Sequence, residues 1–119
     1  MALLSKQDIL NSPDRKYEEV PVPEWGGAVR VKSLTGRERD AFEASLIKGA
    51  GKGRTNDYVN MRARLCAICI VDEAGARVFE DSEVEMLGAK SSAALDRVFT
   101  VAQRLSGMSD EDVEELEKN

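Results

Sequence analysis

Residues 19–46, EVPVPEWGGAVRVKSLTGRERDAFEASL, contain the pattern of a β-hairpin followed directly by a capped helix. Valines alternate with other residues on both sides of Gly26-Gly27, as in two half-buried strands joined by a turn. These valines are Val20, Val22, Val29 and Val31. Thr35 precedes Glu38 by three residues, so each side chain can accept a hydrogen bond from the other's backbone N–H as a capping box. A hairpin with a helix packed on it is the smallest unit of this chain that could bury a core.

The helix in this stretch is predicted to cover about residues 36–48. Phe42 and Leu46 lie one turn apart and form an apolar stripe, which we expect to pack on the hairpin. The segment KGAGKGRTN, residues 48–56, follows it. Glycines interleaved with basic residues suggest a phosphate-binding loop, but that motif needs a preceding strand and a Ser or Thr after the lysine. We therefore interpret the segment as a flexible basic linker.

Two prolines restrict the first strand of the hairpin. Pro21 and Pro23 cannot donate to a neighbouring strand, and their two-residue spacing points both to the same side. We therefore expect this strand to lie at a sheet edge, with a longer or bulged turn after it. Trp25 lies beside the turn, where it is either a lid on a small core or an exposed anchor for a partner. The lid is favoured because tryptophan is usually largely buried.

Further helices are predicted on both sides of this unit. Ser5 and Asp8 are spaced as a capping box for a short first helix, and Leu4 and Ile9 occupy the positions of a hydrophobic staple. That helix is expected to end before Pro13, because proline disfavours helical backbone in the residue before it.

Helical spacing predicts a central helix and a long last helix in the second half of the chain. The central helix begins at Asn56 or Asp57 and ends in the apolar run CAICIV, residues 66–71, which we expect to be deeply buried. A tight turn and a brief helix lie between the two. The last main helix begins at Ser91 or Ser92. Its predicted inward face comprises Leu95, Val98, Phe99, Ala102 and Leu105.

The chain contains no histidine and two cysteines, which limits its chemistry. Without histidine, the usual general base near neutral pH and the commonest metal ligand are both missing. Cys66 and Cys69 form a C-x-x-C pair, but a zinc site needs two further ligands. A redox pair normally lies at an exposed helix start, whereas these cysteines lie late in an apolar segment. We therefore predict buried thiols, no metal site, no cofactor and no enzymatic activity.

Composition indicates a globular protein whose 119 residues suffice for one domain. Apolar residues make up 42% of the chain and charged residues 33%, as in ordinary globular proteins. The net charge of −5 argues against binding to a phosphate backbone, so no nucleic-acid partner is expected. Because the chain has neither an apolar run of about 20 residues nor a signal sequence, we expect a cytosolic protein that does not bind membranes.

These patterns predict an α+β fold, in which a small N-terminal β-hairpin packs on a mainly α-helical body of four or five helices. We expect one domain over residues 1–107 and an acidic, marginally helical tail over residues 108–119. Only Val113 and Leu116 remain to be buried in the helix of that tail. Two interpretations are open: a frayed end, or a segment that becomes ordered on a partner or on a continuation of the chain.

Three segments resemble the tail assembly chaperones of long-tailed bacteriophages. They are PEWGGAVRV at residues 23–31, LTGRERDAFE at residues 34–43, and VDEAGARVFEDSEVEMLGAKSSAALDRVFTVAQRLSG at residues 71–107. The resemblance covers most of the chain, from about residue 9 to residue 107, in the same order and spacing. It rests on the whole arrangement of these segments.

The resemblance implies an assembly factor rather than an enzyme. Chaperones of this family coat the long tape-measure protein in the host cytoplasm, keep it soluble and recruit tail-tube subunits. They are generally absent from the finished virion. In many of these phages a programmed ribosomal frameshift adds a longer C-terminal domain to a minority of copies, so this chain would be the short form. The alternative is a structural tail component, such as a tube or connector protein, that stays in the virion.

Contacts with such partners are expected to be apolar and repeated, because a long helical client exposes apolar stripes. The candidate contact residues are Trp25, Pro21 and Pro23 in the hairpin and Val113 and Leu116 in the tail. The resemblance and a bare strand edge both favour self-association as well.

Overall fold

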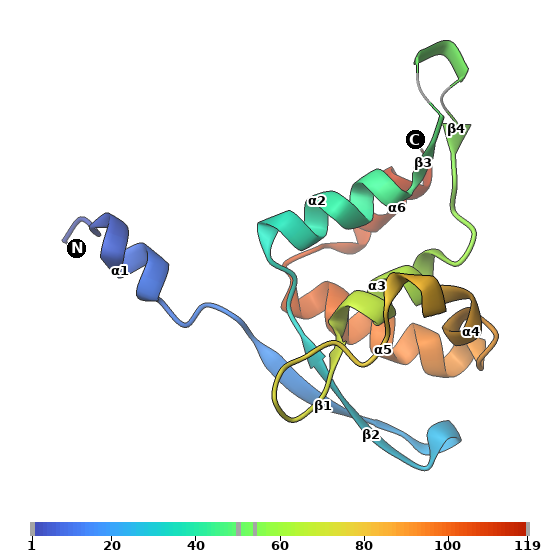
Figure 1. The fold of residues 1–119 in the computed structure, drawn as a ribbon, viewed down its shortest axis with the longest axis horizontal. Coiled ribbons are helices and arrows are strands. Elements are labelled where there is room, and N and C mark those ends of the chain that lie inside the picture. The colour runs from blue at the N-terminus through green and yellow to red at the C-terminus, as the bar shows by residue number, and fades with distance from the viewer. Residues whose placement is uncertain (1, 50, 54, 119) are drawn as a thin grey trace.

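The computed structural model of the chain describes residues 2–49, 51–53 and 55–118 as an α+β fold, which confirms the predicted fold class. The described helices are α1 (Lys6–Asn11), α2 (Gly36–Ser45), α3 (Met61–Cys69), α4 (Val84–Gly88), α5 (Ser92–Leu105) and α6 (Asp110–Lys118). An antiparallel sheet has the order β1 (Tyr17–Val22), β2 (Gly27–Lys32) and β5 (Ile70–Val71), and β3 (Ile47–Lys48) pairs separately with β4 (Thr55–Asn56). Helices α2 to α6 pack together beside the sheet, whereas α1 projects from the body on an extended segment (Figure 1).

The predicted hairpin is present as β1 and β2, and three of its four valines are buried, with Val29 partly buried. Val20, Val22 and Val31 are each at most 3% exposed. The turn is longer than two residues, as predicted. A 3-10 turn at Pro23–Trp25 leads into Gly26, whose φ of 78° is a left-handed conformation that glycine adopts without strain.

The helix that covers the hairpin is α5 rather than the predicted α2. Helix α5 packs against both β1 and β2, whereas α2 ends at Ser45 and packs on α3. Phe42 and Leu46 are buried as expected, and they contribute to the common core. The prediction was wrong because periodicity shows that a helix has an apolar face but does not show which element covers it.

Helix α3 begins later and ends earlier than the apolar pattern predicts. Asn60 precedes it in a left-handed conformation with a φ of 59°, so the helix begins at Met61. The apolar run after Cys66 is largely buried, as predicted. Ile70 and Val71 nevertheless leave the helix and pair with β2 as β5. A two-residue strand has no periodicity of its own, so the sequence does not reveal it.

The segment interpreted as a flexible linker contains regular structure. Strands β3 and β4 pair with each other, and a 3-10 turn at Gly51–Gly53 lies between them. The Asp57 N–H also donates to the Leu46 carbonyl at 2.6 Å, which holds the two ends of the segment together. Ala50 and Arg54, which belong to the same segment, lie outside the described residues.

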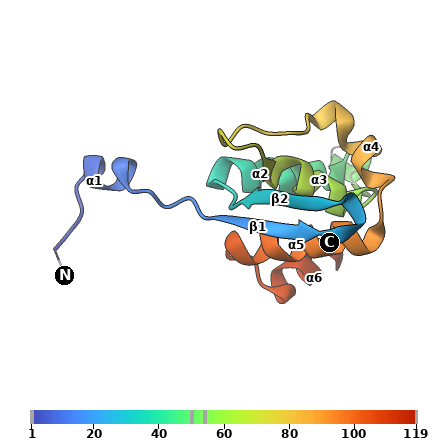
Figure 2. The same cartoon turned by 90° about the horizontal axis from the view of Figure 1, so that it is seen from below.

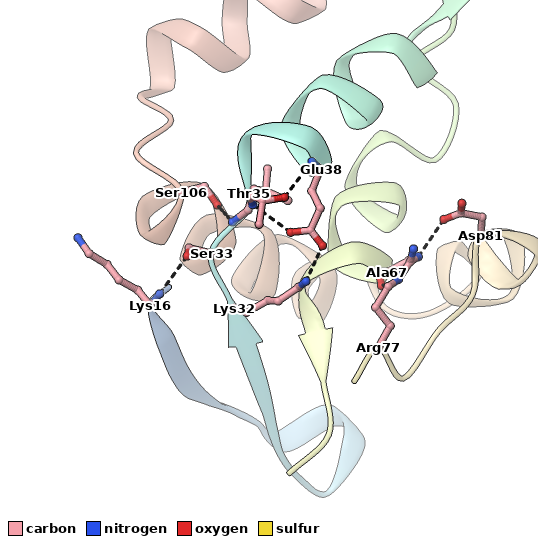
Figure 3. Close-up of polar contacts among 10 residues, drawn as sticks. Lys16, Lys32, Ser33, Thr35, Glu38, Ala67, Arg77, Asp81 and Ser106 are labelled. Atoms are coloured by element: carbon pink, nitrogen blue, oxygen red, sulfur yellow. Dashed lines mark hydrogen bonds and ion pairs between the residues drawn. The ribbon is translucent and has the colours of Figure 1, made fainter. Parts of the chain in front are cut away.

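The junction between β2 and α2 is held by a capping box and a buried ion pair (Figure 3). The predicted capping box of Thr35 and Glu38 is present. The Glu38 carboxylate also accepts a hydrogen bond from the Lys32 ammonium at 2.5 Å, and the Lys32 side chain is only 7% exposed. Burial raises the pKa of the Glu38 carboxyl, but hydrogen bonds from Lys32 and Thr35 outweigh it, so the pKa lies below its usual value.

Two further hydrogen bonds connect this junction to distant parts of the chain (Figure 3). The Lys16 N–H donates to the Ser33 hydroxyl at 3.0 Å, just before β1 begins. The Leu34 N–H donates to the Ser106 hydroxyl at 2.9 Å, at the end of α5. The start of α2 is therefore fixed relative to both the hairpin and α5.

Candidate partner-binding surfaces

The hairpin tip, which we define as residues 22–27, is fixed to α5 by charged side chains. Arg97 donates two hydrogen bonds to the Glu24 carboxylate, at 2.7 and 3.0 Å. The bonds from Arg97 hold the pKa of the Glu24 carboxyl below its usual value. Nearer the start of β1, Arg104 donates to Glu18 at 2.8 and 3.0 Å. These partners are 73 and 86 residues apart, so local sequence patterns could not predict either pair.

Trp25 lies at the hairpin tip and combines features of both sequence interpretations. Its side chain is partly buried and packs against the core, as a lid does. It also lines a groove on the surface of the molecule. The indole Nε1 atom is buried and has no acceptor among the described residues. An unpaired buried N–H destabilises the folded protein.

Pro21 lies on an edge strand of the described sheet, as predicted, because β1 has β2 as its neighbour on one side. The Ser33 N–H donates to the Lys16 carbonyl, and these two residues continue the register of the hairpin. The backbone N–H and C=O groups of Lys16, and of every second residue after it, therefore point toward β2. Pro21 lies at an alternate position, so its backbone groups point toward the open edge. Pro23 was predicted in the same strand but lies in the turn after it, as the first residue of the 3-10 turn, where its fixed φ is favourable.

A groove of about 640 Å³ lies beside the sheet, between β2, β5, the segment 72–79 and α4. Glu18 on β1 faces α5, so its neighbour Glu19 and the cross-strand partner Arg30 face the opposite side, where the groove is found. Figure 2 shows the sheet between α5 and the segment 72–79. The apolar lining includes Trp25, Ala28, Val78, Phe79, Met86 and Leu87. Sequence reasoning missed this groove because several separate segments build it.

The C-terminal tail forms an ordered helix that docks on the body. The Met108 N–H donates to the Gln103 carbonyl, which reverses the chain after α5. Met108 is buried, and Val113 and Leu116 are partly buried against the core. These two candidate contact residues therefore direct their apolar side chains toward the chain's own core.

The two cysteines are free and buried, as predicted. Burial raises the pKa of both thiols to about 12, so neither Cys66 nor Cys69 is ionised near neutral pH. Within the described residues, no three side chains of the types that hold metal ions form a group. Among the described helices, none is both long and apolar enough to cross a membrane.

An apolar groove and an open strand edge therefore lie on the same α+β body. Comparison with known protein families matches residues 5–119 to the family described as phage tail assembly chaperone. The chain therefore belongs to the phage tail assembly chaperone family, which confirms the resemblance seen in its sequence. No curated protein and no solved structure matches the chain. Membership supports a non-enzymatic role in phage tail assembly and an interaction with tail proteins.

Proposed function

We propose that this chain is a chaperone that binds the tape-measure protein of its phage, keeps it soluble and helps recruit tail-tube subunits around it. Membership of the tail assembly chaperone family is the observation that carries this proposal. A long helical client exposes apolar stripes that aggregate unless a partner covers them. The net charge of −5 on this chain would keep such a complex soluble. In this proposal the chain acts in the host cytoplasm and is absent from the mature virion.

The proposed client contacts lie on the hairpin tip and on α6. Pro21, just before the hairpin tip, and Pro23, within it, precede Trp25 in the chain, and the partly buried ring of Trp25 supplies a rigid aromatic anchor. Val113 and Leu116 become available only if α6 leaves the core. The hairpin tip is therefore the first surface to test.

Co-expression with the tape-measure protein of the same phage tests the proposal. The client is expected to become soluble and to co-elute with this chain. Trp25→Ala should abolish co-elution, whereas Tyr58→Ala should preserve it. Tyr58 is the matched control because it is also a partly buried aromatic residue whose polar atom is buried without a partner among the described residues. Equal client binding by the two variants would remove Trp25 from the contact surface.

The alternative function is a structural tail component, and purified virions distinguish it from a chaperone. A chaperone is expected to be missing from the particles, whereas a tube or connector protein would remain in them. The resemblance also implies a longer, frameshifted form in a minority of copies, so co-expression should be repeated with that form. If neither form makes the client soluble and the virions contain the chain, the chaperone proposal is wrong.

A further inference from the structure

We propose that α6 covers a docking site for an amphipathic helix of the client, and that the client's helix displaces α6 when it binds. The site is the surface of α2 and α5 beneath α6, which we call the α6 seat. The proposal rests on the proposed function, because it requires a helical client. It adds a place for that client on this chain and gives α6 a regulatory role.

The way α6 docks shows which kind of helix the α6 seat accepts. Val113 and Leu116, three residues apart, are partly buried against the core. Met108, in the turn before α6, is 3% exposed. Residues three apart lie on the same side of a helix, so the α6 seat accepts one apolar stripe. Figure 1 shows α6 running beside α2, and Arg39 of α2 is close enough to affect Asp112 of α6.

Two polar side chains of the body meet the start of α6. Gln103 of α5 is 9% exposed, and its Nε2 atom donates to the Asp110 carboxylate at 2.9 Å. Leaving a buried amide without an acceptor is costly, so the α6 seat needs an acceptor at this point. Hydrogen bonds from Ser109 lower the pKa of the Asp112 carboxyl, and Arg39 lowers it further. The α6 seat therefore favours a helix with a carboxylate about one turn before its apolar residues.

Helix α6 is held weakly compared with the helices of the core. Among its described side chains, residues 110–116, none is fully buried. None of the described elements lies as close to α6 along its length as α3 lies to α5. A helix of nine residues is marginal by itself, so α6 depends on docking through Val113 and Leu116. A longer helix carries further apolar side chains on the same face and can replace it.

An occupied seat makes binding selective. The apparent affinity of a ligand is reduced by the fraction of molecules whose site is open. Weak apolar segments would therefore fail to displace α6, whereas a long helical client with a continuous apolar stripe would succeed. In the absence of a client, α6 also keeps the apolar surface of the seat away from water.

A competition between two forms of the full chain tests the displacement. The release variant Val113→Ser/Leu116→Ser removes the apolar side chains that hold α6 and leaves the α6 seat unchanged. It is co-expressed with the wild-type chain and the tape-measure protein of the same phage, each form carrying a different tag. The release variant should outnumber the wild type in the eluted complex by roughly tenfold, because its seat is already open.

Hydrogen exchange on the two forms without the client gives an independent measurement. In the wild type, the α6 amides should be less protected than those of α5 by roughly a hundredfold, as expected for a helix that opens locally. In the release variant, α6 should lose its remaining protection, whereas α3 and α5 should keep theirs. Retained protection in α3 and α5 shows that the variant is folded.

A second variant and a control keep the competition informative if the release variant aggregates. Ser109→Ala removes the hydroxyl that accepts from the Asp112 N–H at 3.1 Å, so it destabilises α6 without altering either apolar surface. It should be enriched in the complex as well, by a smaller factor. Glu114→Ser is the matched control, because Glu114 belongs to the same helix and its side chain is exposed. Its ratio to wild type should remain near one.

The sign of the change decides between two roles for Val113 and Leu116. If they contact the client directly, the release variant binds the client less well than the wild type, and the displacement proposal is overturned. An unchanged ratio, or equal protection of α6 and α5 in the wild type, overturns it too. Both results leave the proposed function intact as long as the wild type co-elutes with the client. If no form co-elutes with the client, the proposed function fails, and the displacement proposal fails with it.

Discussion

Replacing Glu38 by Gln removes the negative charge beside a buried lysine and leaves the helix cap in place. A glutamine can still accept the Thr35 N–H, so the start of α2 keeps its capping hydrogen bond. The Lys32 ammonium, whose side chain is 7% exposed, loses its carboxylate partner at 2.5 Å. Removing one partner of a buried ion pair costs about 3–5 kcal/mol. Because the Glu38 side chain is 23% exposed, we expect the lower end of this range, about 3 kcal/mol.

Urea unfolding measures this loss. With an m-value of about 2 kcal/mol/M, the midpoint of Glu38→Gln should fall by about 1.5 M at neutral pH, with the m-value unchanged. The double variant Lys32→Met/Glu38→Gln should recover most of the lost stability, because it no longer buries an unpaired charge. A loss below about 1 kcal/mol, or a double variant no more stable than the single one, would refute the reasoning.

The same residue makes stability depend on pH in the acid range. Burial raises the pKa of the Glu38 carboxyl, but the bonds from Lys32 and Thr35 lower it further, so the folded-state pKa is depressed. The unfolded state then takes up the proton first as the pH falls. This stabilisation is fully present above the ordinary glutamate value of about pH 4.3 and is lost as the pH falls through the folded-state value. Glu38→Gln should lack this part of the acid dependence.

Three further substitutions or treatments give separate tests. Gly26→Ala places a Cβ on left-handed backbone and should cost about 1 kcal/mol in urea unfolding, whereas Gly27→Ala, with open space and no positive φ, should be nearly neutral. Equal effects would contradict the turn geometry. Gly88→Ala brings a Cβ into overlap with a side chain at the start of α3 and should lower the Tm by several degrees; an unchanged Tm would contradict this packing. Cys66 and Cys69, whose thiols have pKa values raised by burial to about 12, should react with a thiol reagent only as the protein unfolds. Rapid labelling of the native protein would contradict their burial.

Local patterns predicted the features whose partners are close in the chain. The capping boxes at Ser5 and Thr35 each join residues three apart, and both are present. The alternating valines predicted the hairpin, and the prolines predicted an edge strand with a longer turn. In each case the residues that determine the feature lie close together in the chain, so the local sequence is sufficient to predict it.

The packing of the elements against one another could not be predicted in the same way. Strand β5 is two residues long and is specified by its pairing with β2 rather than by a pattern of its own. The exposed apolar side chains of α1 were predicted to belong to a helix, but no pattern indicates that the helix would extend away from the body. The groove depends on Trp25, Phe79 and Met86 coming together from distant segments. Such arrangements depend on how all the elements pack around the common core, which no local sequence pattern specifies.

The charge pairs between the hairpin and α5 have a consequence for synthesis on the ribosome. Glu18 cannot form its ion pair until Arg104 has been synthesised, 86 residues later. At about 5–20 residues per second, the wait is roughly 4–17 s, whereas an isolated hairpin forms in about 1–10 μs. During that interval neighbouring nascent chains on one messenger RNA carry hairpins whose apolar face is not yet covered by α5. Pro21, which offers no N–H at the outer edge of β1, limits strand pairing between those chains, and this edge stays open after α5 has packed on the face of the hairpin.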